Sequence, residues 1–512
     1  MKLRELLRSA GMSPDVALDP EVSAVEYDSR RSGAGVLFVA VPGFHVDGHR
    51  FASAAVSAGA IGVVAERLPD PPIPGSVPLI LVEASRVALS ALAAAAAGHP
   101  SRRMLVAGIT GTDGKTTTTT MLWAAWREAG EKAASLSTVD ARVGDEVTPN
   151  PARITTLEAP ELHRRLAGLA AAGCTRVAIE TSSHALHLHR VDDVDYDIAV
   201  FTRITSEHLD VHGSREGYLR TKRRLLEMVS GRPQGLAVLN ADDGFAFPSL
   251  IQVPVARRLV YSVTGAPGAD LAALGLRVDA AGVRFTAATP WGRSPVSLRL
   301  AGGFNAANAL AAIGAACGSG ADLDRVVQGL AGLERVTGRM ERVDLGQTFQ
   351  VVVDYAHTAD ALETVLTELR AATGGRLWAV FGSAGERDRE KRPAMGEVAA
   401  RLADVVVVTD EDPRDEDRQT IIEEIAAGAE AGGAVRGVNL HLVADRAQAV
   451  AFAIGGAAAG DTVLLAGKGH EKTIETAGGA VPWDERAAAI EALRRRGVVP
   501  QGDAGPGIRR GP

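Results

Sequence analysis

An apolar run that breaks into a glycine-rich turn and then into a helix constrains this chain more than any other stretch. It covers residues 104–120, MLVAGITGTDGKTTTTT. Gly111 and Gly114 allow backbone N–H groups to face an anion, and the helix that follows directs its positive dipole end to the same point. Lys115 can bring a cation to the β- and γ-phosphates of a nucleotide, and Thr116 can offer a hydroxyl to Mg²⁺. The stretch therefore predicts a strand, a phosphate-binding turn and a helix.

The turn is a variant of the common phosphate-binding loop. The strict spacing requires glycine at position 109, where this chain has Ile109, so the match is to Thr-Gly-Thr-x-Gly-Lys-Thr. A threonine-rich helix start after a tight turn is the alternative. The order of strand, glycines, lysine and hydroxyl favours the phosphate cradle.

Length and composition set the outer limits. A chain of 512 residues is too long for one core, and at roughly 100–200 residues per domain it predicts about three domains. Its 46% hydrophobic and 23% charged residues are typical of a globular protein. A formal charge of −7 argues against nucleic acid as the main partner, because phosphate backbones bind basic surfaces. We therefore expect small-molecule partners.

Cysteine content and hydropathy indicate the compartment. Cys174 and Cys317 are the only cysteines, so no disulfide framework is expected and a reducing cytosol is the simplest setting. No run reaches the ~18 apolar residues that a membrane span requires. We expect a cytoplasmic monomer without membrane insertion.

Strands and helices alternate along the chain, which predicts an α/β protein with mainly parallel sheets. Strands are expected at 36–41, 61–65, 104–110, 177–180, 198–204, 235–240, 350–355, 377–381, 404–409 and 461–466. We predict a smaller N-terminal α/β domain (1–100), a central P-loop-type parallel sheet with helices (101–335), a Rossmann-like C-terminal domain (336–496) and a flexible tail (497–512).

Polar turns follow the strands of the first domain. One contains Asp28, Ser29 and Arg30, and the other, at 43–48, contains His45. Because α/β sheets bind ligands at strand ends, both turns are candidate binding segments. Ordinary solvated turns are the alternative.

The strand ends of the central domain carry further candidates. Glu180, in AIETSSHAL, follows an apolar strand and precedes hydroxyl residues, as expected of a Mg²⁺ ligand just beyond a strand. His208 follows the next strand. His184, His187 and His189 suggest a metal cluster at first sight, but their spacing mixes helix and strand periods and disfavours zinc.

Two features of this domain have ordinary structural interpretations. Lys222 lies in a predicted helix over 216–229, where a lysine is by default a solvated surface charge. Asn305 and Asn308 open a small-residue helix after a double glycine and, taken on their own, could simply be helix caps.

Four expected strands of the last domain end in polar clusters. They are 354–357 (DYAH), 382–392 (GSAGERDREKR), 410–414 (DEDPR) and 467–471 (GKGHE). Repeated polar turns after parallel strands predict a rim that binds one ligand. The alternative is that some of these segments are charged surface loops.

Together these motifs resemble the Mur ligase family, and within it the ligases that add the third amino acid to a UDP-N-acetylmuramoyl dipeptide. The resemblance covers the chain from Asp28 to about Arg486. Its most specific pieces are GITGTDGKTTT, IETSSHAL, HLDVHGS followed by Lys222, GGFNAANALAA, GRME, DYAHTADAL and GKGHE.

The resemblance implies an ATP-dependent amide-bond synthesis in peptidoglycan precursor formation. The D-glutamyl carboxylate of UDP-N-acetylmuramoyl-L-alanyl-D-glutamate would attack the γ-phosphate of ATP, and a diamino acid would then displace phosphate from the acyl phosphate. Phosphorylation supplies the leaving group that a carboxylate lacks, while Lys115 and Mg²⁺ would neutralise charge on the transferred group. ATP as a substrate and Mg²⁺ are the implied cofactors.

The resemblance also implies roles for individual residues. The catalytic set is Lys115, Glu180, His208, Lys222 and His357. The metal ligands are Thr116, Glu180, His208 and Lys222, the last as an N6-carboxylysine carbamate. The ATP-binding set is Gly111, Thr112, Asp113, Gly114, Lys115, Thr116, Thr117, Asn305, Arg339 and Asp354.

Two substrate sets carry over in the same way. The UDP-muramoyl-dipeptide set is Ser29, His45, Thr155, Thr156, Ser182 and Arg190. The set for the incoming amino acid is Arg387, Asp412, Pro413, Arg414, Gly467 and Glu471.

One departure from the family bears on the amino acid. Members that add meso-diaminopimelate usually have Asp-Asn-Pro-Arg where this chain has Glu-Asp-Pro-Arg at 411–414. Arg414 suits the distal carboxylate of diaminopimelate, whereas Asp412 adds a negative charge that would favour an ammonium. We expect meso-diaminopimelate, with L-lysine or L-ornithine as the alternative. Smaller departures are Asp113 and Arg203 where Asn is commoner, and Ala359 for Pro.

Other functions compete with this one. A ligase that adds D-alanyl-D-alanine and a folylpolyglutamate synthase are disfavoured by the Asp-Ser-Arg turn at 28–30 and by the loops at 411–414 and 467–471. A nucleotide-binding protein without catalysis would not need Lys115 and Lys222 together with the metal ligands. Amino-acid-dependent ATP turnover distinguishes these classes.

Overall fold

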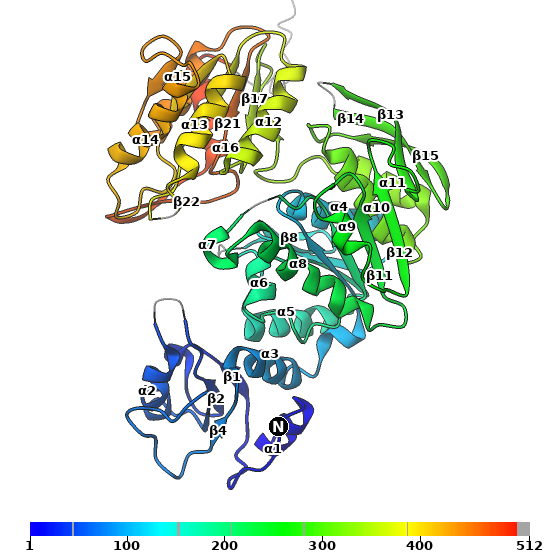
Figure 1. Ribbon diagram of the computed structural model, residues 1–512, viewed down its shortest axis with the longest axis vertical. Coiled ribbons are helices and arrows are strands. Elements are labelled where there is room, and N and C mark those ends of the chain that lie inside the picture. Colours follow the sequence, from blue (N-terminus) through cyan, green and yellow to red (C-terminus); the bar gives the residue numbers. More distant parts are fainter. Residues whose placement is uncertain (44–45, 151–153, 206, 280–281, 387, 499–512) are drawn as a thin grey trace, which may run out of the picture. The chain divides into compact units, whose positions relative to one another are not determined.

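The computed structural model describes residues 1–43, 46–150, 154–205, 207–279, 282–386 and 388–498 (Figure 1). His45 and Arg387, two of the predicted site residues, lie outside these ranges. The chain divides into two compact units. The first comprises Met1–Ala272, Ala288–Gly292 and Ala307–Gly329, and the second comprises Ala273–Ala287, Arg293–Ala306 and the chain from Leu330 onward. The division into domains at residues 100, 335 and 496 remains a prediction.

The first unit begins with a four-stranded parallel sheet in the order β1-β2-β3-β4. Its strands are β1 (Ala24–Glu26), β2 (Val36–Val39), β3 (Gly62–Ala65) and β4 (Leu79–Leu81). The flanking helices are α1 (Leu3–Ser9), η1 (Ser29–Arg31), η2 (Gly48–Phe51), α2 (Ala52–Ser57) and α3 (Ser85–Ala96). All four residues of β2 are buried, as expected of a strand covered on both faces. In Figure 1, α3 lies beside α5 (Ala159–Ala171) of the next sheet.

The central sheet has the strand order β15-β14-β13-β12-β11-β10-β5-β9-β6-β7-β8. Its strands are β5 (Leu105–Thr110), β6 (Ala133–Leu136), β7 (Asp140–Val143), β8 (Glu146–Pro149), β9 (Arg176–Glu180), β10 (Ile198–Phe201), β11 (Leu236–Asn240), β12 (Arg257–Ser262), β13 (Leu271–Asp279), β14 (Gly282–Thr289) and β15 (Gly292–Leu298). From β6 to β12 the neighbours pair in parallel, which confirms the predicted fold class. The antiparallel hairpin of β7 and β8 was not predicted.

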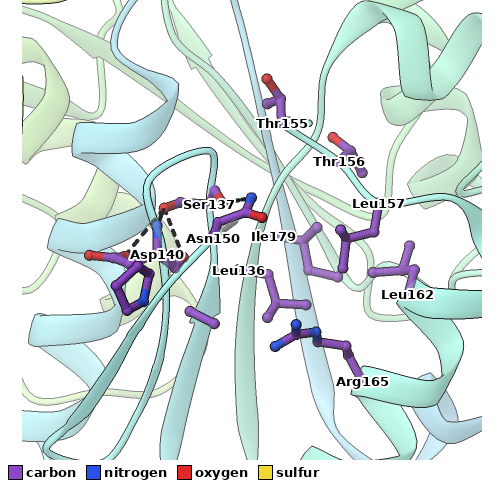
Figure 2. A pocket seen from close by; sticks show the side chains of 12 residues that line it. Leu136, Ser137, Asp140, Asn150, Thr155, Thr156, Leu157, Leu162, Arg165 and Ile179 are labelled. Carbon is purple, nitrogen blue, oxygen red and sulfur yellow. Dashed lines mark hydrogen bonds between the residues drawn. The ribbon is translucent and has the colours of Figure 1, made fainter. Parts of the chain in front are cut away.

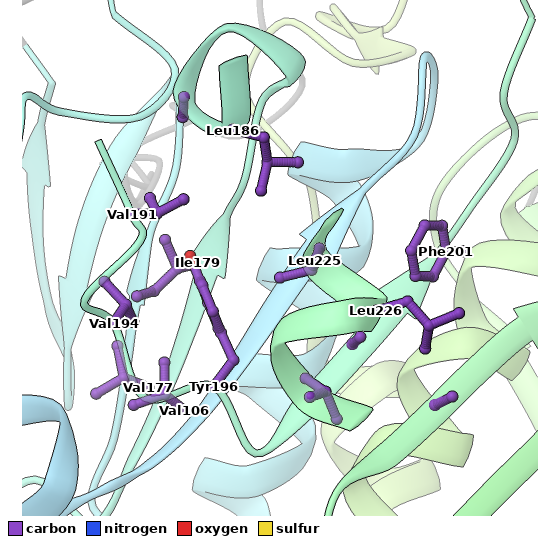
Figure 3. Close-up of a cluster of buried hydrophobic side chains, with 14 of the residues drawn as sticks. Val106, Val177, Ile179, Leu186, Val191, Val194, Tyr196, Phe201, Leu225 and Leu226 are labelled. Carbon is purple, nitrogen blue, oxygen red and sulfur yellow. The ribbon is translucent and has the colours of Figure 1, made fainter. Parts of the chain in front are cut away.

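The helices of this region connect the strands and cover the sheet. They are η3 (Pro100–Arg103), α4 (Lys115–Glu128), α5, α6 (Ser183–His187), α7 (Leu209–His212), α8 (Arg215–Ser230), α9 (Phe247–Leu250), α10 (Asn305–Gly318) and α11 (Leu323–Gly332). Leu225 and Leu226 of α8 belong to one buried cluster with Val106, Tyr196 and Phe201 (Figure 3). Because burying each such side chain contributes roughly 1.5–3 kcal/mol, this cluster holds α8 firmly against β5 and β10.

The second unit contains a six-stranded sheet in the order β16-β17-β21-β18-β19-β20. Its strands are β16 (Glu341–Arg342), β17 (Gln350–Val353), β18 (Leu377–Phe381), β19 (Val405–Val408), β20 (Leu440–Leu442) and β21 (Thr462–Leu465). Its helices are α12 (Ala359–Ala372), α13 (Lys391–Leu402), α14 (Arg418–Ala431), α15 (Arg446–Gly456) and α16 (Glu485–Arg495), and β22 (Thr473–Thr476) and β23 (Gly479–Pro482) form a hairpin. Within the described part of the six-stranded sheet, β16 pairs antiparallel with β17 and the other neighbouring strands pair in parallel.

Every strand predicted from the sequence is present, with ends shifted by a few residues. In the described part of the chain, no helix is long and apolar enough to cross a membrane.

A buried histidine in α5 predicts acid sensitivity. His163 is fully buried, and among the described residues neither ring nitrogen has a hydrogen-bond partner. Burial, assisted by nearby His99, lowers its pKa to about 4. Between pH 6.5 and 4 the unfolded chain therefore binds a proton that the native chain does not, so stability falls as the pH falls. We expect the titration of His163 to lower the free energy of unfolding by about 2 kcal/mol between pH 7 and pH 5.

The His163→Leu variant tests this prediction, because leucine is similar in size to histidine, suits a buried position and cannot titrate. Urea unfolding of both proteins at pH 7 and pH 5 should show a smaller loss of stability in the variant. Equal losses would contradict the assignment.

Candidate active site

The predicted phosphate cradle forms at the carboxyl end of β5, between the ends of β9 and β10. Gly114 has a left-handed φ of 82° and precedes the first residue of α4, so the helix N-terminus faces the turn. A Cβ atom at Gly111 would lie 1.9 Å from Thr202 Oγ1, so a larger residue does not fit. Lys115 Nζ donates to the carbonyls of Gly111 (3.0 Å) and Thr112 (2.6 Å).

The segment after β10 supports the cradle, which the sequence did not indicate. Thr202 Oγ1 donates to the Asp113 carbonyl at 2.6 Å, and Thr112 N donates to the Arg203 carbonyl at 2.6 Å. Thr205 N donates to Thr112 Oγ1 at 2.9 Å. The turn at 111–114 is therefore fixed from a neighbouring strand as well as from its own helix.

Two predicted magnesium ligands meet beside this turn. Thr116 Oγ1 donates to Glu180 Oε2 at 3.0 Å, and both side chains are buried. Thr138 N donates to the same carboxylate oxygen at 2.9 Å, a contact that the sequence did not suggest. Hydroxyl and carboxylate oxygens are hard ligands that suit Mg²⁺. Within the described ranges, no group of three or more histidine, cysteine, aspartate or glutamate side chains could hold a metal ion.

Lys222 is buried, so the surface position expected by default is wrong. Only 1% of the residue is exposed, and its Nζ donates to the Gly111 carbonyl at 2.7 Å. The ammonium lies 4.5 Å from the centre of the Tyr218 ring. Burial, assisted by Lys115, lowers the Lys222 pKa well below its usual value. The packing of α8 thus places a readily neutralised amine at the cradle.

His208 lies near the same two lysines. It has a left-handed φ of 54° and precedes α7. Burial lowers its pKa against the opposing effect of Glu207, and Lys115 and Lys222 add to the lowering. A neutral imidazole of this kind can accept a proton or bind a metal ion.

The other histidines of this region lie in two groups. The His184 ring lies 4.4 Å from the His208 ring and 6.0 Å from the His212 ring, measured between centroids. His189 instead pairs with Asp192, at 2.6 Å between Nδ1 and Oδ2. The argument against zinc therefore stays a prediction from the spacing.

Part of the predicted dipeptide set gathers beside Glu180. Thr156 Oγ1 donates to the Glu180 carbonyl at 2.7 Å and accepts from Ser182 N at 3.0 Å. Arg190 donates to the Thr156 carbonyl at 3.1 Å. Thr155 and Thr156 also line the pocket in Figure 2, whose apolar side is formed by residues that include Leu136, Leu157, Leu162 and Ile179. Ser29 lies in η1, after β1 of the N-terminal sheet.

In the second unit, three polar segments are joined around Asp412. Its buried carboxylate accepts from Lys468 Nζ at 2.7 Å and from Glu475 N at 2.9 Å. Gly385 N donates to the Asp412 carbonyl at 2.8 Å. The charge expected to attract a substrate ammonium therefore already has an internal partner.

The neighbours of Asp412 complete this cluster. Lys468 is fully buried and also pairs with Glu471. Burial raises the pKa of Glu411, and in the described structure its Oε2 atom has no hydrogen-bond partner. Arg414 has a left-handed φ of 55°, and its backbone N–H donates to the Glu475 carbonyl at 3.0 Å. Pro413 lies between Asp412 and Arg414, and Gly467 directly precedes Lys468.

Three predicted nucleotide-site residues of the second unit, Arg339, Asp354 and His357, lie around Tyr355 and its neighbours in the chain. Asp354 accepts from the backbone N–H groups of Met340 (2.7 Å) and Ala356 (2.8 Å), and burial raises its pKa against the effect of Arg339. The Arg339 guanidinium lies 4.8 Å from the Tyr355 ring centre, and the His357 ring lies 4.7 Å from it.

The two asparagines of α10 make different contacts. Asn305 Nδ2 donates to the Ala301 carbonyl at 2.6 Å. Asn308 Oδ1 instead accepts from Thr118 Oγ1 of α4 at 3.3 Å, and it limits the space beside Gly114. Asn308 is therefore a contact between helices and not a cap.

Comparisons with known proteins agree with this arrangement. Residues 21–97, 109–316 and 338–469 match the models of the Mur ligase family catalytic domain, the Mur ligase middle domain and the Mur ligase glutamate ligase domain. The chain is 47% identical to the UDP-N-acetylmuramyl-tripeptide synthetase of Roseiflexus sp. (strain RS-1), over 97% of this chain and 99% of that protein. It is 41% identical to the UDP-N-acetylmuramoyl-L-alanyl-D-glutamate–2,6-diaminopimelate ligase of Geobacillus kaustophilus (strain HTA426), with 94% and 96% covered. A solved structure of a ligase with the latter name matches with a TM-score of 0.66 and 29% identity, covering 97% and 99%.

Proposed function

Because the chain belongs to the Mur ligase family, we propose that it joins meso-2,6-diaminopimelate to the D-glutamyl carboxylate of UDP-N-acetylmuramoyl-L-alanyl-D-glutamate, using ATP. The observation that carries this proposal is the convergence of Lys115, Glu180 and Lys222 on one glycine-rich turn. The product is a peptidoglycan precursor, and we propose a cytoplasmic monomer.

The reaction has two steps. The D-glutamyl carboxylate attacks the γ-phosphorus of ATP, the bond to the β–γ bridging oxygen breaks, and ADP leaves. The neutral amine of the amino acid then attacks the acyl carbon, the C–O bond to the phosphate breaks, and phosphate leaves with the former carboxylate oxygen. The nitrogen loses one proton, to the departing phosphate or to water, as the amide forms. Lys115 and the N-terminus of α4 would stabilise negative charge on the transferred phosphoryl group electrostatically, because both already face the phosphate-binding turn.

Mg²⁺ would be held by Thr116, Glu180 and His208, with Lys222 contributing as a carbamate. The bound ion would neutralise charge on the phosphate oxygens. Carbamate formation requires a neutral lysine amine that attacks CO₂ and then loses a proton. The lowered Lys222 pKa supports this modification, because burial beside Lys115 disfavours the ammonium form.

The remaining substrate assignments follow the family's motifs. Ser29 and His45 would bind the uridine part, and Thr155, Thr156, Ser182 and Arg190 the muramoyl dipeptide. Asn305, Arg339, Asp354 and His357 would contact the nucleotide. Arg387, Asp412, Pro413, Arg414, Gly467 and Glu471 would form the amino-acid pocket.

Arg414 is the residue that favours diaminopimelate. A guanidinium can bind the distal carboxylate through two parallel hydrogen bonds, and lysine and ornithine lack that carboxylate. The Lys468 partner of Asp412 weakens the argument that Asp412 selects an ammonium. The alternative of L-lysine or L-ornithine is supported by Glu411, a buried carboxylate whose Oε2 is without a hydrogen-bond partner in the described structure.

Phosphate release tests both the reaction and the amino acid. The purified protein is supplied with ATP, Mg²⁺ and the UDP-muramoyl dipeptide, and with diaminopimelate, lysine or ornithine in separate reactions. We expect diaminopimelate to be preferred, and Arg414→Met to lower kcat/KM for it by about 10²-fold. Arg436→Met, which alters an exposed arginine of the same unit, is the control.

Each other outcome of this assay has a definite meaning. Preference for lysine or ornithine would replace diaminopimelate with the alternative substrate. ATP turnover that depends on no amino acid would contradict the ligase function.

A further inference from the structure

We propose that Arg446 is a positioning residue that holds the two amino-acid-binding loops, 411–414 and 467–471, at a fixed separation. This inference rests on the proposed function, because those loops are assigned there to the incoming amino acid. Arg446 is the first residue of α15. In the hydrogen bonds described below, its partners are two backbone carbonyls and Glu485, and none of them is a loop side chain that we assign to the substrate.

The Arg446 guanidinium joins two strand ends that are not neighbours in the sheet. One Nη atom donates to the Asp410 carbonyl at 2.8 Å, and the other donates to the Ala466 carbonyl at 2.6 Å. Asp410 follows β19 and precedes Glu411, whereas Ala466 follows β21 and precedes Gly467. Strand β18 lies between β19 and β21. The side chain thus spans one strand and anchors the residue before each loop.

Glu485 fixes the guanidinium in this orientation. Its two carboxylate oxygens each accept a hydrogen bond from Arg446 at 2.8 Å, from Nε and Nη2. Arg446 is 2% exposed and Glu485 is 1% exposed. Because the geometry is bidentate and the pair is excluded from water, the guanidinium plane has little freedom to rotate.

The same carboxylate connects a third segment. Trp483 Nε1 donates to Glu485 Oε2 at 2.6 Å, and Trp483 follows the hairpin of β22 and β23. That hairpin in turn accepts the Arg414 backbone N–H through the Glu475 carbonyl. One buried ion pair therefore anchors both loops and the hairpin that contacts Arg414.

Lysine cannot replace arginine in this role. The two carbonyls and the carboxylate require donors that point in several directions in one plane, which a guanidinium provides and a single ammonium does not. Arg446→Lys should keep the charge opposite Glu485 and lose part of the loop anchoring. We expect the KM for the amino acid to rise about tenfold or more, with the KM for ATP unchanged within about twofold.

The double variant Arg446→Met/Glu485→Leu guards against a folding defect. Replacing a buried ion pair with apolar side chains is often neutral for stability, yet it removes both carbonyl contacts. We expect this variant to fold and to show the same selective rise in the amino-acid KM.

Asp461→Asn is the matched control, because Asp461 lies at the opposite end of β21. It accepts hydrogen bonds from Arg376 N at 2.7 Å and Trp378 Nε1 at 3.1 Å. This substitution should lower the melting temperature without a selective change in the amino-acid KM.

Hydrogen–deuterium exchange provides a readout that does not depend on catalysis. Peptides that cover 411–414 and 467–476 should exchange faster in Arg446→Lys than in the natural protein, and peptides from β17 should not. Wild-type exchange and a wild-type amino-acid KM in that variant would overturn the inference. Parallel changes in every KM would also overturn it. If the natural protein shows no amino-acid-dependent turnover, the proposed function fails while the exchange result still decides the role of Arg446.

Discussion

Replacing Lys222 with methionine is expected to lower ligase turnover by about 10³-fold while the protein remains folded. The side chain is buried, and its Nζ lies 2.7 Å from the carbonyl oxygen of Gly111 in the phosphate-binding turn. Methionine fills a similar volume, so α8 should keep its packing against β5. It cannot form a carbamate, so the metal site would lose an anionic ligand. Steady-state phosphate release and thermal unfolding measure the two effects separately.

Carbon dioxide distinguishes a carbamate from a free amine at this position. Turnover of the natural protein should fall when CO₂ is removed from the buffer and should recover when bicarbonate is added, whereas Lys222→Met should not respond. Arg223→Ala is the control, because Arg223 is the next residue of the same helix and pairs with Glu227. A Lys222→Met variant with near-normal turnover would show that the buried amine has no part in the reaction.

The Lys115→Ala variant should lose activity to a similar extent, by about 10³-fold in kcat/KM for ATP. Lys115 Nζ now donates to the carbonyls of Gly111 and Thr112, which places the ammonium over the turn where the phosphates would bind. Without it, charge on the transferred phosphoryl group lacks its main protein cation. Initial rates at varied ATP concentration provide the measurement.

Folding should be little affected by this change, because the Lys115 ammonium contacts only the turn in the hydrogen bonds described above. Lys132→Ala is the matched control, since Lys132 is another lysine of the first unit that donates to a carbonyl, that of Ala172. Retention of ATP-dependent turnover by Lys115→Ala would contradict the phosphate-cradle assignment.

Local patterns predicted the strand ends well. The turn at 111–114, the carboxylate of Glu180 and the polar loops at 411–414 and 467–471 all follow apolar strands, and the structure places them at the carboxyl ends of parallel strands. This succeeds because a parallel sheet brings the ends of its strands to one edge, so each motif needs only its own strand to be recognised.

Hydrogen-bond partners that come from distant segments of the chain were not predicted. Thr138 donates to Glu180 from a turn before β7, and Thr205 supports Thr112 from the segment after β10. Arg446 reads in the sequence as an ordinary helix residue, yet it is buried between two strand ends. The local sequence around a backbone N–H or a helical arginine does not indicate which distant group it will contact.

The sequence by itself determined the phosphate-binding turn, the order of strands and helices and the resemblance to the Mur ligases, because spacing within a short segment specifies a turn and its chemistry. Only the tertiary structure decided which charged side chains are buried and which are paired with another charge. Lys222 changes from an expected surface lysine to a buried amine, and Asp412 changes from an expected free carboxylate to the partner of Lys468. The physical reason is that desolvation and ion pairing depend on which elements pack around a side chain, and long-range contacts set that packing.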